Sequence, residues 1–206
     1  MYLSLGNDFA PGLNIRNCLA VGFTVSFGAR DRQTLSLQGE CAVVTKWDER
    51  FMTLAFQIAE WSSCFKPERK VGAVIVKNKR ILTTGYNGAP AGMQSCMERR
   101  TCLRNELGIR SGERHELCYA IHAEQNAIIQ AAKLGVSIDD ATMYCTHQPC
   151  AICAKMIINA GISRLVYAVP YPDDFAKRIL DAADIGIEWI ELAVSPAQAD
   201  TAEHTR

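Results

Sequence analysis

Hydrophobic residues first recur at helical spacing in the segment that follows Thr45. The apolar positions are Phe51, Leu54, Ala55, Ile58 and Ala59. Steps of three and four residues between such positions predict a helix with one apolar face directed at a core. Because Thr45 with Asp48 three residues later is typical of a capped helix start, we expect the helix to begin there.

Short apolar runs alternate with turns and helical segments along the rest of the chain. Strands are predicted at residues 71–76, 80–84, 142–146, 164–169 and 187–192. Helices are predicted at residues 123–134, 149–161 and 174–184. The first two strands should form an antiparallel hairpin, whereas strands separated by helices predict parallel neighbours. The expected fold class is α/β, with three α/β/α layers around a mixed, mostly parallel central sheet.

Composition divides the chain into three regions. Residues 1–44 are rich in glycine, asparagine and serine without sustained periodicity, so we expect a poorly ordered leader. Residues 45–194 contain every predicted element and should form one domain of ordinary size. Within them, residues 93–121 are a polar, cysteine-containing insertion. Residues 195–206 form a polar tail.

Charge and cysteine content narrow the functional classes. The chain has 22 basic and 22 acidic residues, which argues against nucleic acid as a partner. No apolar run reaches the ~20 residues of a membrane helix, so no membrane partner is expected. The nine cysteines are odd in number and unevenly spaced, which argues against a disulfide framework and favours metal ligation. This cysteine usage predicts a cytoplasmic protein.

Two short motifs carry the strongest chemical signal. They are His122-Ala123-Glu124 and Pro149-Cys150-Ala151-Ile152-Cys153. One imidazole and two thiolates are the three protein ligands of a catalytic zinc, whose fourth position holds water. Zinc lowers the pKa of that water to about 7, and a neighbouring carboxylate such as Glu124 can then move protons.

Each motif alone is weak. Structural zinc sites and redox pairs share C-x-x-C, and an isolated His-x-Glu is more often a buried histidine beside a surface carboxylate. The combination is stronger because both motifs lie at predicted helix starts, where partial positive charge favours thiolate. Gly135 suits the end of the first helix, and Pro149 suits the first position of the second. The alternative is a structural zinc closed by a fourth protein ligand, such as another cysteine.

The order H-x-E…P-C-x-x-C is the signature of zinc nucleobase deaminases. On these residues the chain resembles the deoxycytidylate (dCMP) deaminase family of the cytidine-deaminase-like superfamily, and is similar to its bacterial late-competence-operon branch. The resemblance spans about residues 47–192. It rests on the segments 71–76, 85–90, 111–118, 122–128 and 146–155. It implies the cytidine-deaminase-like fold.

The resemblance also implies an activity, namely hydrolytic deamination of dCMP to dUMP and ammonia, which feeds thymidylate synthesis. In the family pattern the catalytic Zn2+ is held by His122, Cys150 and Cys153. Glu124 is the proton donor and acceptor. The substrate contacts implied are Asn87, Gly88, Ala123 and Tyr171. Turn chemistry is the alternative explanation for Asn87, and core or rim packing for Tyr171.

Relatives can carry a second, structural zinc, and soft ligands cluster in the corresponding region here. The implied ligands are Cys64, Cys96, His115 and Cys118, with Cys102 as an alternative. Ordinary buried thiols are the other interpretation. The resemblance further implies a homo-oligomer such as a hexamer, and regulation by a nucleotide effector bound with Mg2+. The sequence itself shows no effector site.

Two other functions stay open. One is deamination of a different cytosine or adenine substrate, such as a nucleoside, dCTP or a tRNA base. The neutral charge and the lack of interleaved basic and aromatic residues count against a nucleic acid substrate. The other is a non-catalytic zinc protein accessory to competence and DNA uptake. The presence of Glu124 counts against it, because a structural zinc site has no use for that carboxylate.

Overall fold

The computed structural model describes residues 44–110, 114–171, 173–183 and 185–192. The predicted leader, apart from its last residue, and the predicted tail lie outside these ranges. A five-stranded sheet has the order β2-β1-β3-β4-β5. Its strands are β1 (Gly72–Lys77), β2 (Arg80–Tyr86), β3 (Thr142–His147), β4 (Arg164–Val169) and β5 (Gly186–Trp189). β1 is antiparallel to β2 and β3, and β3, β4 and β5 are mutually parallel, so the sheet is mixed as predicted.

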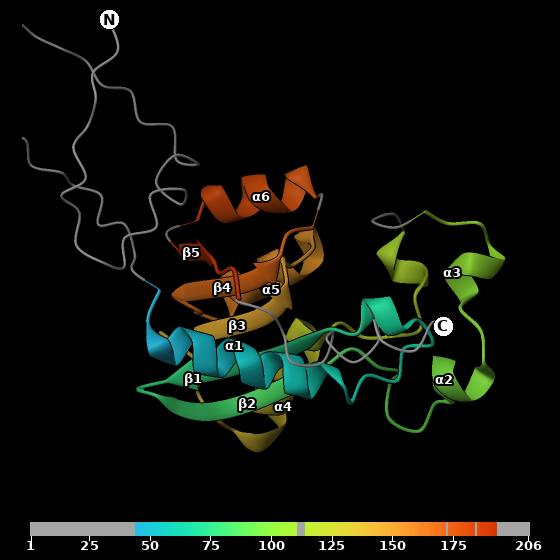
Figure 1. Cartoon of the computed structure of the whole chain (residues 1–206), viewed down its shortest axis with the longest axis horizontal. Helices are drawn as coiled ribbons and strands as arrows, with labels where there is room; N and C mark the ends of the chain where they lie inside the picture. The colour runs from blue at the N-terminus through green and yellow to red at the C-terminus, as the bar shows by residue number, and fades with distance from the viewer. Residues whose placement is uncertain (1–43, 111–113, 172, 184, 193–206) are drawn as a thin grey trace, which may run out of the picture. The chain divides into compact units, whose positions relative to one another are not determined.

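Helices cover both faces of this sheet (Figure 1). The helix α1 (Lys46–Ala59) packs on one face, and the other face is covered by α4 (Ala123–Leu134), α5 (Ala151–Asn159) and α6 (Asp174–Asp181). The segment between β2 and α4 contains short helical pieces. They are α2 (Cys96–Arg99), α3 (Leu103–Glu106) and the 3-10 turn His115–Leu117; another 3-10 turn, Pro67–Arg69, precedes β1. The predicted three-layer α/β/α architecture is therefore confirmed.

Local sequence signals place most element ends correctly. Thr45 caps α1 in a complete capping box with Asp48, and Gly135 ends α4 in the left-handed conformation. Two later elements are shorter than predicted. The helix α6 ends at Asp181, and β5 ends at Trp189 although the Ile190 N–H still donates to the Tyr167 carbonyl.

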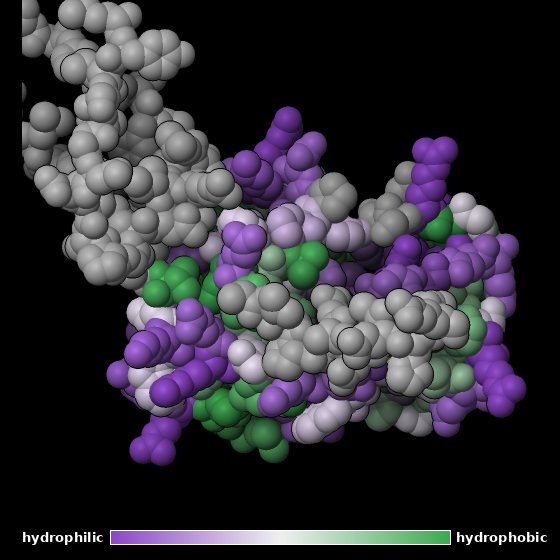
Figure 2. All heavy atoms as spheres, viewed as in Figure 1, coloured by the Kyte–Doolittle hydropathy of each residue, from purple (hydrophilic) through white to green (hydrophobic). Residues whose placement is uncertain are grey.

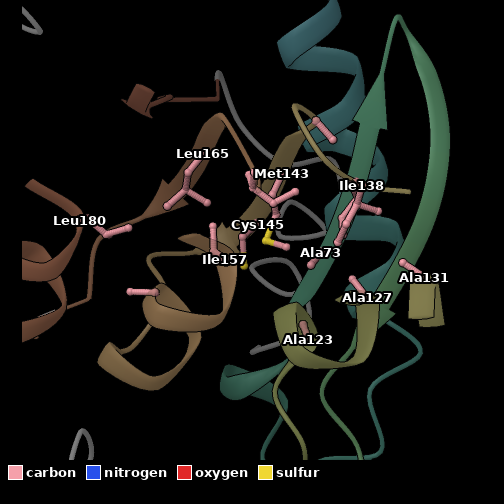
Figure 3. Close-up of a cluster of buried hydrophobic side chains, with 14 residues drawn as sticks. Ala73, Ala123, Ala127, Ala131, Ile138, Met143, Cys145, Ile157, Leu165 and Leu180 are labelled. Atoms are coloured by element: carbon pink, nitrogen blue, oxygen red, sulfur yellow. The ribbon is translucent and has the colours of Figure 1, made fainter. Parts of the chain in front are cut away.

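Two glycines bring helices unusually close to the hairpin of β1 and β2. A Cβ on Gly72 would lie 2.1 Å from the Ala55 carbonyl oxygen of α1. A Cβ on Gly85 would lie 2.2 Å from the Ala123 oxygen and 2.5 Å from the Ala127 nitrogen of α4. In Figure 3, Ala123, Ala127 and Ala131 of α4 belong to the same buried cluster as Ala73 of β1. Because no side chain could fit, glycine is required where each helix lies against its strand.

A buried polar network joins α1 to the strands β3, β4 and β5. The Asp48 carboxylate, 1% exposed, accepts hydrogen bonds of 2.7 Å from the Tyr144 hydroxyl and from the Arg164 guanidinium. Arg164 also pairs with Glu188 on β5. Burial would raise the pKa of Asp48, but the hydrogen bonds from Arg164, Tyr144 and Thr45 outweigh it and lower the pKa to about 2. The ionised carboxylate therefore stabilises the fold.

Exposed apolar side chains are spread over several elements of the described surface. The largest exposed fractions belong to Trp61, Leu134, Phe175 and Leu107. On the face drawn in Figure 2, hydrophobic residues form small groups among hydrophilic ones. Among the described residues, no helix has both the length and the apolar character needed to span a membrane.

Replacing Gly85 by alanine should destabilise the protein by about 1–3 kcal/mol, since the new methyl group meets helix backbone that cannot rotate away. Gly186→Ala is the matched control, because the nearest atom to its Cβ would lie at 3.6 Å. Urea unfolding of both variants measures the difference. Equal stability of the two would mean that α4 does not depend on this contact.

Asp48→Asn should lower the free energy of unfolding at pH 7 by about 2–3 kcal/mol, because it removes the charge from a buried ion pair. Since the folded pKa is depressed, the stabilisation is present above about pH 4 and is lost as the pH falls toward 2. The difference in free energy of unfolding between Asp48→Asn and the parent protein should therefore narrow over that pH interval. Urea titrations with a chelator present measure this difference. Asp140→Asn, on a carboxylate 74% exposed, should change stability by less than about 0.5 kcal/mol. A constant gap between pH 7 and pH 2 would contradict the ionic explanation.

Candidate metal centre and active site

The first part of the centre lies at the start of α4. His122 is the N-cap of this helix with extended backbone, and its N–H donates to the Gln125 side chain at 3.0 Å. Glu124 follows in the first turn and is 4% exposed. The contact at Gly85 involves Ala123, the residue between them. The position of both side chains is therefore tied to the packing of α4 on β2.

The second part lies at the start of α5. The sequence predicted that this helix begins at Pro149, but it begins at Ala151 because Cys150 keeps the extended backbone of an N-cap. Asp173 holds this start in place. Its carboxylate accepts from the Ala151 N–H at 3.0 Å and from the Ala176 N–H at 2.8 Å, so it caps α5 and α6 together. The structure thus adds Asp173 as a residue that positions the peptide after Cys150.

The two helix starts bring three soft ligand atoms together. Nδ1 of His122 lies 3.5 Å from Sγ of Cys150 and 3.4 Å from Sγ of Cys153. Ordinary Zn–S and Zn–N bonds at tetrahedral angles would separate sulfur from nitrogen by about 3.6 Å. These three residues are the one group of at least three His, Cys, Asp or Glu within the described ranges whose ligand atoms all lie within 4.8 Å of one another. The donor set fits zinc.

Protonation of the two thiols agrees with a cation site. A hydrogen bond from Cys153 is the largest influence on Cys150, and with the His122 imidazole it lowers the pKa of Cys150 to about 3. The same hydrogen bond, together with burial, raises the pKa of Cys153 far above its ordinary value. A dication held between the two sulfurs would favour the thiolate form of both.

Glu124 combines burial with contact to these groups. Burial raises the pKa of its carboxyl group, although the imidazole of His122 acts in the opposite direction. The thiols of Cys145 and Cys153 lie within its hydrogen-bonding reach. Burial thus favours the protonated form of this carboxyl group more than exposure to solvent would. The role of proton donor and acceptor for Glu124 stays a prediction.

A pocket of about 520 Å³ opens beside the centre. Four predicted residues line it: His122, Glu124, Ala123 and Cys150. Asn87 and Tyr171 line it as well, whereas Gly88 lies outside the lining and forms a β-bridge with Ile121. The pocket therefore gathers three of the four predicted substrate contacts.

Asn87 already has structural partners. Its Oδ1 accepts from the Val71 N–H and its Nδ2 donates to the Arg69 carbonyl, both at 2.8 Å. The side chain therefore holds the segment before β1 at the pocket wall. One further N–H of the amide can still meet a substrate atom.

The predicted second-zinc ligands are not assembled in the same way. Cys64, Cys102, His115 and Cys118 line the pocket, and Cys96 is buried. Burial raises the pKa of Cys64 and of Cys96, and neighbouring cysteines raise both further, so the thiols lie near one another. However, no three of these five described residues meet the 4.8 Å distance that unites the catalytic set.

His115 lies toward the catalytic centre. Its ring centroid is 5.3 Å from that of His122, edge to face, and 6.2 Å from that of Tyr171. Its Nε2 is buried without a hydrogen-bond partner, and burial lowers the pKa of the ring. An unpaired buried nitrogen in a pocket is an expected feature of a group that meets a ligand or metal.

Known proteins are similar to this chain over the region that contains the centre. Residues 45–169 match the sequence profile described as the cytidine and deoxycytidylate deaminase zinc-binding region. The ComE operon protein 2 of Bacillus subtilis is 37% identical over 147 residues, which cover 71% of this chain and 72% of that protein. The deoxycytidylate deaminase of Schizosaccharomyces pombe is 36% identical over 140 residues, which cover 68% of this chain and 42% of the relative. The chain thus spans less than half of that relative's length.

A solved structure shares the fold as well. The dCMP deaminase of cyanophage S-TIM5, in complex with dCMP and dUMP, aligns with a TM-score of 0.60 at 33% identity. The alignment covers 72% of this chain and 100% of the phage chain. The matched profile covers more than half of the present chain and contains both halves of the metal centre. The chain therefore belongs to the family defined by the cytidine and deoxycytidylate deaminase zinc-binding region.

Proposed function

We propose that this protein is a zinc-dependent deaminase that hydrolyses dCMP to dUMP and ammonia. The observation that carries the proposal is the meeting of His122, Cys150 and Cys153 beside the buried carboxyl group of Glu124, in one pocket. The phage relative with bound dCMP and dUMP, and the yeast deoxycytidylate deaminase, support dCMP as the substrate. Since dUMP is the precursor of thymidylate, the reaction would feed thymidylate synthesis.

Glu124 would perform the proton transfers. When bound, zinc supplies a Lewis acid that lowers the pKa of water to about 7. Glu124 would take a proton from the attacking water and deliver it to ring N3 while the water oxygen adds to C4. It then carries the second proton of the water to the exocyclic amine, which leaves as ammonia while the C4 carbonyl forms. One water is consumed for each amine released, and the carboxylate is regenerated.

The pocket favours a phosphorylated substrate. Its lining includes Lys66, Arg69 and Arg104, and the carboxylates in the lining are Glu68 and Glu124. A volume of about 520 Å³ is within the range of small-molecule sites. Basic side chains at such a site attract a phosphate and strengthen its binding. The same lining is less suited to an uncharged nucleoside.

Two alternatives remain open to experiment. A different cytosine or adenine substrate would use the same metal and the same carboxylate. A non-catalytic role in competence is motivated by the similarity to the ComE operon protein 2. The buried position of Glu124 at the metal ligands counts against the second alternative. A hexamer, a magnesium-bound nucleotide effector and a cytoplasmic location stay predictions of the family resemblance.

Glu124→Gln should reduce deamination of dCMP by at least about 10²–10⁴-fold, because the amide keeps the shape of the carboxyl but cannot carry protons. Zinc content should stay near that of the parent protein. Glu68→Gln is the control, since it removes another carboxylate of the pocket lining and should retain most activity. Product formation from dCMP, dCTP and deoxycytidine, with zinc measured on the same samples, checks the prediction. A Glu124→Gln protein with near-parental turnover would remove Glu124 from the mechanism.

We also propose a second, structural zinc among Cys64, Cys96, Cys102, His115 and Cys118. The mutual proximity of the thiols and the unpaired Nε2 of His115 support it. Binding would require these ligands to draw closer than they are here.

Fully loaded protein should then contain two zinc ions per chain by elemental analysis. A Cys96→Ser variant should lose one ion and much thermal stability, whereas Cys150→Ser should lose the other ion together with activity. One zinc per chain in the fully loaded parent would exclude the second site.

A further inference from the structure

The end of β3 carries a pair of side chains that the proposed reaction does not yet use. Thr146 is fully buried, and its Oγ1 accepts a hydrogen bond of 3.2 Å from the Gly72 N–H on β1. The same hydroxyl lies 3.0 Å from Nδ1 of His147. His147 lines the pocket three residues before Cys150. The pair thus connects the sheet interior with the substrate space.

The hydrogen-bond network determines where the proton of His147 resides. Burial lowers the pKa of His147, so the ring is neutral at pH 7 and carries one N–H. If that hydrogen were on Nδ1, it would donate to Oγ1, and the Thr146 hydroxyl hydrogen would need another acceptor. Among the described residues Oγ1 has only Gly72 N and Nδ1 as partners. A fully buried hydroxyl without an acceptor is strongly disfavoured, so the hydroxyl donates to Nδ1.

The other ring nitrogen is left for a ligand. With Nδ1 accepting, Nε2 carries the hydrogen and is a donor. Within the described part of the chain, His147 has no hydrogen bond besides the one at Nδ1, and its Nε2 is not among the buried unpaired atoms. The donor is therefore accessible, and it belongs to a residue that lines the pocket.

We infer that the Thr146 hydroxyl presets the tautomer of His147 so that its Nε2–H donates to an oxygen of the bound cytosine nucleotide. His147 is then a specificity residue for the deamination, and Thr146 is the residue that positions it. This inference rests on the function proposed above. A neutral donor can meet a phosphate oxygen, a sugar oxygen or the pyrimidine carbonyl. All three are oxygen acceptors, and assays with different substrates distinguish among them.

The tautomer can be measured without any activity. ¹⁵N NMR of the zinc-loaded protein, with histidine labelled, should show His147 protonated at Nε2; the His147→Gln protein identifies its signals among the four histidines. Thr146→Ser keeps the hydroxyl and should keep this tautomer, whereas Thr146→Val should give a mixture. Protonation at Nδ1 in the parent protein would overturn the inference.

Kinetics test the contact itself. His147→Ala should lower kcat/KM for dCMP about tenfold, mainly through KM, and His147→Gln should recover most of it because its amide offers an N–H at the position of Nε2. In the His147→Gln background, Thr146→Val should cost less in kcat/KM than in the parent, since the amide donor does not depend on the hydroxyl. Unchanged kcat/KM in His147→Ala, or no recovery in a folded, zinc-loaded His147→Gln protein, would reject the donor role.

A parallel assay with deoxycytidine locates the acceptor. A loss confined to dCMP assigns a phosphate oxygen, and an equal loss with deoxycytidine assigns an oxygen of the sugar or base. If the zinc-loaded parent protein deaminates no cytosine substrate, the proposed function fails, while the NMR result still reports on the preset donor. If the parent is active and His147→Ala is equally active, only the present inference fails.

Discussion

Close packing of α4 on the hairpin of β1 and β2 is the contact on which the rest of the site depends. Gly85 has no side chain, so the backbone of Ala123 and Ala127 lies directly against β2. The Thr83 hydroxyl donates to the Ala127 carbonyl across the same contact. The two residues that flank Ala123 are His122, a predicted metal ligand, and Glu124, the predicted proton carrier. A helix held this tightly delivers both side chains with little freedom, which catalysis by a fixed metal and base requires.

The helix α5 is held at the centre by a different interaction. The start of α5 is held by Asp173, which lies 23 residues beyond Cys150 and also caps α6. Its carboxylate satisfies a helix N–H that has no partner within the helix. Each half of the metal centre therefore has its own support, one by backbone packing and one by a capping carboxylate. The metal ligands themselves have only to complete the arrangement.

Features that depend on neighbouring residues in sequence were predictable. The capping box at Thr45, the glycine after α4 and the C-x-x-C spacing at a helix start each involve positions within four residues of one another, and the structure agrees with them. Contacts between residues that are far apart in the sequence were not predictable. Arg164 and Asp48 are 116 residues apart, and nothing local marks either as half of a buried pair. The family resemblance assigned His115 to a second zinc with the cysteines, and the packing of its ring against His122 could not be foreseen from the sequence. The Asp173 cap likewise depends on two helices meeting in space.

Burial has opposite effects on the pKa values of the acids and of the bases in this pocket. It raises the pKa of Glu124, which favours the protonated form of this carboxyl group. It lowers the pKa of His115 and of His147, so both rings stay neutral. A neutral imidazole has one donor and one acceptor, and its direction is then set by whatever binds the other nitrogen. For His147 that partner is the Thr146 hydroxyl, which accepts from the Gly72 N–H, so the hydrogen-bonding character of this part of the pocket wall depends on the contact between β1 and β3. The fold thus positions the reacting groups and also determines which of them carry protons.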